Sequence, residues 1–130
     1  MIGISIRIVS KRSGGHAALP GESVIDVDRA HPVLGNPFVL RDHHDGVERE
    51  RVINQYGEKL RADLAVKGPM SQALDALAER AVLGERIALR CWCAPKPCHA
   101  DLLRNEILTK LGLAEDIEIR ISAKKQIRLF

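Results

Sequence analysis

Residues 91–101 lie between an apolar run and a helical pattern, and they contain every cysteine of the chain and its one tryptophan. The apolar run, 86–90, is typical of a buried strand, and residues 102–111 have the pattern of a helix. Functional groups are often placed at such a junction, because the strand end is rigid and the helix N-terminus offers oriented N–H groups. The stretch therefore predicts an α/β fold with a site at this junction, but it does not identify a reaction.

Hydrophobic periodicity predicts further strands and helices along the chain. The predicted strands are 3–9, 24–27, 87–91 and 117–121, and the predicted helices are 45–64, 70–83 and 99–111. We expect the first two strands to form a hairpin with a long loop, and residues 124–130 to form an edge strand or a tail. The expected fold is α/β, with a single mixed β-sheet of about four to five strands covered by about three helices.

Local signals predict where the helices begin and end. Asp45 and Glu48 have the spacing of a capping box at the start of the first helix. The pair at 68–69, a glycine and a proline, should end that helix, and Gly84 and Gly112 should follow the next two.

The composition is that of one globular domain over residues 1–130. Hydrophobic residues make up 45% of the chain and aromatic residues only 3%, so we expect a core of Leu, Ile, Val and Ala. No apolar run approaches the roughly 20 residues of a membrane span, and residues 1–7 do not resemble a secretory signal. Three clustered cysteines make a poor disulfide framework. We therefore expect a cytoplasmic protein with no membrane partner.

The formal net charge of +3 permits a phosphate-bearing partner without requiring one. Residues 120–128 contain four of the basic side chains. They are interpreted as a solvated tail, with contact to nucleic acid as the alternative. The oligomeric state is left open.

The cysteine loop has three interpretations. Cys91, Cys93, Cys98 and His99 are zinc ligands by type, although their spacing differs from common zinc knuckles. Alternatively, Cys98 lies at a helix N-terminus that favours a thiolate, with His99 and Asp101 as acid, base or hydrogen-bonding groups. In the third interpretation the cysteines are packing residues, Cys91 above all.

Residues 34–38 form the second unusual stretch, Leu-Gly-Asn-Pro-Phe. The amide of Asn36 can donate and accept at once, so a rigid Asn36 beside Phe38 suits the edge and face of a nucleobase. The alternative is a turn plugged by Phe38.

Other residues complete the predicted site. Arg29 or Arg49 would hold a phosphate, and Trp92 would line the pocket from the cysteine loop. The simpler interpretations are that Arg49 is solvated on the helix surface, that Tyr56 is a core residue and that residues 43–44, both histidines, lie in a solvated loop.

Several motifs in this order resemble one family. They are residues 24–27 with Arg29, residues 34–38, Arg49 with Val52, Ile53 and Tyr56, residues 89–93 with Pro95, and residues 98–101 with Leu103. Together they resemble the small phage and bacterial family catalogued as domain of unknown function 4326. The resemblance covers about residues 24–108, with 1–23 as an N-terminal strand extension and 115–130 as a C-terminal strand and tail. The family implies no established activity, and its occurrence in phages suggests nucleotide or nucleic-acid metabolism.

Two functions follow as expectations. The first is an enzyme or enzyme-like domain that acts on a nucleotide, nucleoside or nucleobase between the 29–38 loop and the 92–101 loop, without a cofactor. The second is a non-catalytic module that binds nucleic acid or protein and whose cysteine loop is structural, with zinc bound in one version.

Overall fold

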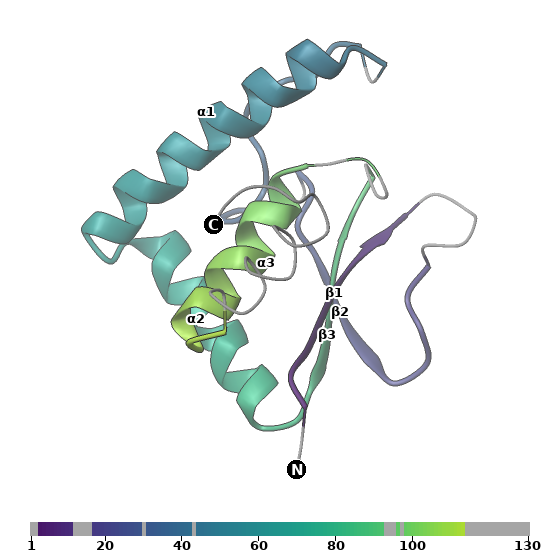
Figure 1. Cartoon of the computed structure of the whole chain (residues 1–130), viewed down its shortest axis with the longest axis vertical. Coiled ribbons are helices and arrows are strands. Elements are labelled where there is room, and N and C mark those ends of the chain that lie inside the picture. The colour runs from purple at the N-terminus through teal and green to yellow at the C-terminus, as the bar shows by residue number, and fades with distance from the viewer. Residues whose placement is uncertain are drawn as a thin grey trace, which may run out of the picture.

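The computed structural model describes residues 3–11, 17–29, 31–42, 44–92, 96 and 98–113 (Figure 1). Its elements in chain order are β1 (Ser5–Ser10), β2 (Glu22–Asp26), α1 (Gly46–Ala65), α2 (Pro69–Val82), β3 (Arg86–Cys91) and α3 (His99–Lys110). This confirms the α/β class and the three predicted helices.

The strands of the described residues form one parallel sheet in the order β1-β3-β2. The predicted hairpin is wrong, because β3 lies between the first two strands and pairs with both. Ile87, Ala88 and Leu89 are all fully buried, as expected for a central strand with a neighbouring strand on each side. A mixed sheet of four to five strands is not confirmed, and residues 117–121 and 124–130 lie outside the described residues.

The helices lie on one side of the sheet (Figure 1). α2 and α3 pack against the strands, and α1 packs against α2 and α3. Ile87 and Leu89 of β3 share one core with Leu74 of α2 and Leu103 of α3. Tyr56 of α1 is the largest fully buried side chain among the described residues, in a core that is otherwise mainly aliphatic, as the composition predicts.

Ion pairs between strands lie on the sheet face opposite the helices. Arg7 of β1 donates two hydrogen bonds to Glu22 of β2, at 2.7 and 2.8 Å. Arg90 of β3 donates to Asp26, its register partner on β2, at 2.6 Å. Such cross-strand pairs make this face polar.

The Arg7–Glu22 pair makes stability depend on pH. The hydrogen bond from Arg7 lowers the pKa of Glu22 from 4.5 to about 2. Since the folded-state pKa is depressed, the stabilisation is present above pH 4.5 and is lost as the pH falls toward 2. We expect Glu22→Gln to weaken this acid dependence and to lower stability at neutral pH, measured by urea unfolding across that pH range. Equal acid dependence in both proteins would contradict the prediction, and Arg7→Gln should reproduce the Glu22→Gln result.

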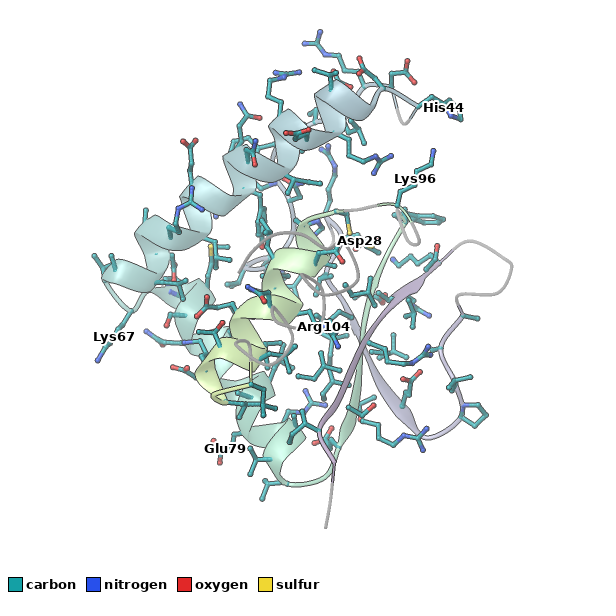
Figure 2. The ribbon with its side chains drawn as sticks, viewed as in Figure 1. Asp28, His44, Lys67, Glu79, Lys96 and Arg104 are labelled. Carbon is teal, nitrogen blue, oxygen red and sulfur yellow. The ribbon has the colours of Figure 1, made fainter. Side chains whose placement is uncertain are left out.

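The outer edge of β1 contacts α3. The N–H of Lys11 donates to the carbonyl of Cys91 at 2.8 Å, so the backbone groups of Lys11 point toward β3. Because the backbone groups of successive strand residues point to alternate edges, those of Ile6 point to the outer edge of β1. There the Nε of Arg104 donates to the carbonyl of Ile6 at 2.6 Å. Figure 2 shows Arg104 beside the strands.

The helix ends follow most of the predicted signals. The Asp45 carboxylate accepts from the N–H groups of Val47 and Glu48 at 3.0 Å and so caps α1. The Glu48 carboxylate does not complete a capping box, because it accepts instead from the N–H groups of Arg41 and Asp42 in the preceding loop.

Glycines in the left-handed region follow the other two helices. Gly84 comes after α2 with φ +101°, and Gly112 comes after α3 with φ +76°.

Within the described ranges, each helix is too short or too polar to span a bilayer.

Candidate functional site

The candidate site lies at the carboxyl edge, which we define as the edge of the sheet where β1, β2 and β3 end at Ser10, Asp26 and Cys91. Because the strands are parallel, the segments that follow them meet there. These segments carry Lys11, Asp28 and Trp92, and α3 begins at the same edge. Figure 2 shows Asp28 and Lys96 toward this end of the sheet and Glu79 at the other end.

Cys98 and Cys91 contact each other at the carboxyl edge. Their Sγ atoms lie 3.1 Å apart, and both side chains are buried. Cys98 is the N-cap of α3, and its N–H donates to the Asp101 carboxylate at 2.8 Å. The structure therefore places Cys91 in the core, as the packing interpretation predicts. The exposed Asp101 carboxylate caps α3 by accepting this hydrogen bond from Cys98.

His99 is buried beside Cys98 and joins three segments. Its Nε2 bonds the carbonyl of Val27 at 2.5 Å, and since a carbonyl only accepts, Nε2 carries the proton. The His99 ring lies 4.8 Å from the ring of Tyr56, at a tilt of 54°. The Tyr56 hydroxyl donates to the carbonyl of Leu34 at 2.7 Å, and burial raises the pKa of Tyr56, so this group stays protonated. Tyr56 and His99 thus connect the 34–38 turn with the start of α3 and the end of β2.

Replacing Tyr56 by phenylalanine tests this connection. The change leaves the ring in place but leaves the carbonyl of Leu34 buried without its hydroxyl donor. We expect a loss of about 1–3 kcal/mol in the free energy of unfolding, measured by urea denaturation. A loss below about 0.5 kcal/mol, the lower bound for such a bond, would contradict the importance of the Tyr56 hydroxyl.

Trp92 is held at the carboxyl edge by Asp28 and Lys11. The indole Nε1 donates to Asp28 Oδ2 at 3.1 Å, and Lys11 Nζ donates to the same oxygen at 2.6 Å. Lys11 Nζ also lies 5.6 Å from the centroid of the indole ring, within cation–π range. Trp92 remains 49% exposed despite these contacts. An aromatic ring that is both fixed and half-exposed offers a stacking surface.

The 34–38 turn is built by local hydrogen bonds and one close approach. Asn36 Oδ1 accepts from the N–H of Phe38 at 2.9 Å, and His31 Nδ1 accepts from the N–H of Leu34 at 2.9 Å. A Cβ on Gly35 would lie 2.5 Å from the carbonyl oxygen of Asp28 and 2.6 Å from that of His31. The turn is therefore packed directly on the segment that follows β2.

This packing bears on the predicted roles of the turn. The side-chain carbonyl of Asn36 stabilises the turn by accepting from the N–H of Phe38. The amide nitrogen of Asn36 has no hydrogen-bond partner in the part of the chain that the structure describes. Phe38 is half-buried against the core, as in the interpretation of a plugged turn. The amide nitrogen of Asn36 therefore keeps its donors for a ligand, and one acceptor site of its carbonyl oxygen is used by the turn.

The two predicted phosphate-binding arginines differ in burial. Arg29 is exposed in the turn that follows Asp28. Arg49 is only 7% exposed, near the start of α1 and two helical turns before Tyr56 on the same buried face, so the interpretation of Arg49 as a solvated surface residue is wrong. Lys96 is exposed in the loop before α3. Of the predicted solvated loop at 43–44, His44 is exposed and His43 lies outside the described residues.

Zinc binding by Cys91, Cys93, Cys98 and His99 stays a prediction. Within the described ranges, no three His, Cys, Asp or Glu side chains are grouped to hold a metal. Cys93 lies outside these ranges, and His99 uses Nε2 for Val27. A zinc site here would therefore need Cys93 together with His99 Nδ1.

A shallow hollow of about 430 Å³ lies on the outer side of α1, away from these groups. Its lining residues are Val47, Glu50, Arg51, Asn54, Gln55 and Glu58. All of them belong to α1 alone, so we do not assign this hollow to the candidate site.

Sequence reasoning missed Lys11 and Asp28. Each follows the end of a strand directly, by one and two residues, and that position is the signal that points to them. Their roles depend on Trp92, which is far from both in the sequence.

The fold and these contacts define a small α/β protein whose candidate site carries an aromatic ring and two thiols at the carboxyl edge of a parallel sheet. The chain belongs to the family described as Domain of unknown function (DUF4326), whose model matches residues 9–109. This confirms the family predicted from the motifs, and the match begins upstream of residue 24. No curated protein and no solved structure matches the chain.

Proposed function

We propose that the protein binds a nucleotide, nucleoside or nucleobase at the carboxyl edge, with the base stacked on Trp92. The single observation that carries the proposal is the half-exposed indole held in place by Asp28 and Lys11. Stacking of a base on an aromatic side chain is worth about 1–3 kcal/mol and accepts any base, because every base has a π-face. Ligands of open α/β sheets bind at this end of the strands.

Positive groups at the same edge support a ligand that carries phosphate. The N-terminus of α3 favours an anion through its oriented N–H groups. Arg29 and Lys96 are exposed on the neighbouring loops, and Arg49 lies buried near the start of α1. In this proposal the donors of Asn36 face the edge of the base.

Chemistry on the bound ligand is proposed for Cys98, with His99 and Asp101 as its assisting groups. The start of α3 favours the Cys98 thiolate electrostatically, whereas burial of the side chain opposes it. Cys98 would therefore react only when the ligand or a local opening exposes it. A cytoplasmic location belongs to the proposal, since a reducing compartment keeps Cys91 and Cys98 as thiols.

Fluorescence titration tests the binding proposal directly, because Trp92 is the only tryptophan of the chain. A nucleoside triphosphate, the monophosphate, the nucleoside and the free base are titrated for each common base. We expect at least one series to give a saturable change in emission. The same ligand at a hundredfold excess over its Kd should stabilise the fold by about 2.7 kcal/mol in a thermal-shift assay. If no compound changes the emission or the unfolding temperature, the proposal fails.

The second candidate is a non-catalytic nucleic-acid or protein-binding module with a structural cysteine loop. The observation that favours it is the buried contact between Cys91 and Cys98, which suits a structural role. Metal analysis of the purified protein decides whether this role includes zinc. Stoichiometric zinc whose removal unfolds the protein would support the second candidate.

A further inference from the structure

We propose that Cys91 and Cys98 form a reversible disulfide at the carboxyl edge, so that this edge is a redox-modified site. The evidence is the 3.1 Å contact between their Sγ atoms. Cys91 ends β3 and Cys98 caps α3, so the contact joins the ends of two regular elements. This inference does not depend on the proposed ligand.

The geometry requires only a small movement. A disulfide bond is about 2.05 Å long, so the two sulfur atoms have to approach by roughly 1 Å. Side-chain rotation at the N-cap can supply this shift without moving β3, whose end is held by Val27 and Lys11 through hydrogen bonds to Arg90 and Cys91. Both sulfur atoms face the core, so the disulfide would be shielded from solvent.

The chemistry is a thiol–disulfide exchange with a low-molecular-weight disulfide such as glutathione disulfide. The Cys98 thiolate attacks one sulfur of the oxidant and forms a mixed disulfide, and the released thiolate takes up the proton that Cys98 lost. The Cys91 thiol then loses its proton and attacks Cys98 Sγ, and the second small thiolate leaves and is protonated. The protein loses two electrons and two protons, and the oxidant gains them.

The structure assigns the order of attack and a slow first step. Cys98 attacks first, because the N-terminus of α3 favours its thiolate. Since Cys98 is only 4% exposed, the first step requires a local opening at the start of α3. The second step is fast, because Cys91 is already in contact. Trp92 follows Cys91 directly, and its fluorescence should report the change.

The test uses Cys93→Ser, which removes the third cysteine of the chain and leaves only the proposed pair. The variant is equilibrated in glutathione buffers of increasing oxidation, quenched with acid, alkylated and weighed by mass spectrometry. We expect both thiols to be lost together over one transition, with a loss of two hydrogen atoms and no attached glutathione. Retention of both thiols throughout would overturn the proposal, as would stable glutathione adducts without the internal bond.

Cys91→Ser, with Cys93 retained, is the matched control. Its Cys98 should accumulate the mixed disulfide with glutathione, because the resolving thiol is missing. An internal Cys93–Cys98 bond that forms as readily as the wild-type disulfide would overturn the assigned pairing.

Wild-type protein provides a measurement that needs no variant. Cleavage after Trp92 separates Cys91 from Cys98, and fragmentation of the cross-linked peptides should show the 91–98 link rather than 91–93 or 93–98.

A separate readout distinguishes this proposal from the binding proposal. The disulfide is measured without any nucleotide, so failure of the nucleotide titration leaves it intact. Conversely, a protein that binds a nucleotide but never forms the disulfide retains the proposed function and loses only this inference.

Discussion

Gly35→Ala is expected to destabilise the fold by about 3 kcal/mol, at the upper end of the cost of overpacking. The added Cβ would lie 2.5 Å from the carbonyl oxygen of Asp28 and 2.6 Å from that of His31. Both neighbours are backbone atoms, so no flexible side chain can move away to make room. The 34–38 turn must then shift away from the segment that carries Asp28. Urea unfolding at neutral pH measures the loss.

Gly57→Ala is the matched control for this prediction. A Cβ at Gly57 meets Arg61 and Leu102 side-chain atoms at 3.4 and 3.5 Å, which is ordinary contact. Gly57 lies inside α1, where alanine is the better helix former by about 1 kcal/mol. We expect Gly57→Ala to be neutral or stabilising. A similar loss in both variants would show that the close approach at Gly35 is not the cause.

Trp92→Ala is expected to weaken nucleotide binding by about 5- to 150-fold, which is the loss of roughly 1–3 kcal/mol of base stacking. Because the side chain is half-exposed, the same change should cost much less stability than a core truncation. Affinity is measured by isothermal titration calorimetry, since the variant has no tryptophan. Unchanged affinity in a stably folded Trp92→Ala protein would remove the stacking surface from the proposal.

Trp92→Phe separates stacking from the positioning of the ring. Phenylalanine keeps an aromatic face but cannot donate to Asp28 as the indole Nε1 does. We therefore expect an affinity between those of the wild type and Trp92→Ala. If Trp92→Phe binds as weakly as Trp92→Ala, the bond to Asp28 matters more than the π-face.

The helices were predictable because their signals are local. The spacing of Val52, Tyr56 and Leu60 predicts α1, and the predicted helix at 45–64 differs from the observed Gly46–Ala65 by one residue at each end. Asp45 caps α1, as its position before the apolar pattern indicates. Pro69, predicted only to end α1, also opens α2, since proline is favoured at the first helical position.

The sheet was predicted less well, because strand pairing is not local. Two strands that are neighbours in sequence suggest a hairpin, but β1 and β2 both pair with β3, which comes 60 residues after β2. The distinguishing sign is the continuous burial of Ile87, Ala88 and Leu89, which marks a central strand. Period-two alternation in β1 is typical of an edge strand as much as of a hairpin strand.

The sequence indicated which segments lie near one another better than it indicated their contacts, and the pocket between the 29–38 and 92–101 loops stays a prediction. The sequence predicts that the 34–38 turn lies near the start of α3, and the structure connects them through Tyr56 and His99. It did not predict that the carbonyl of Asn36 would be taken by Phe38, a bond that depends on the final shape of the turn. Nor could periodicity reveal a bond between Trp92 and Asp28, since no regular spacing connects them.

The contact between Arg104 and the carbonyl of Ile6 bears on self-association. An exposed strand edge is a template for pairing with another chain, and proteins often place a cation there to prevent aggregation. Among the described residues β1 is an edge strand, and there the guanidinium of Arg104 donates to the backbone acceptor that an incoming strand would need. A foreign strand would have to compete with that hydrogen bond and desolvate the arginine, so we expect Arg104 to oppose edge-to-edge pairing at β1.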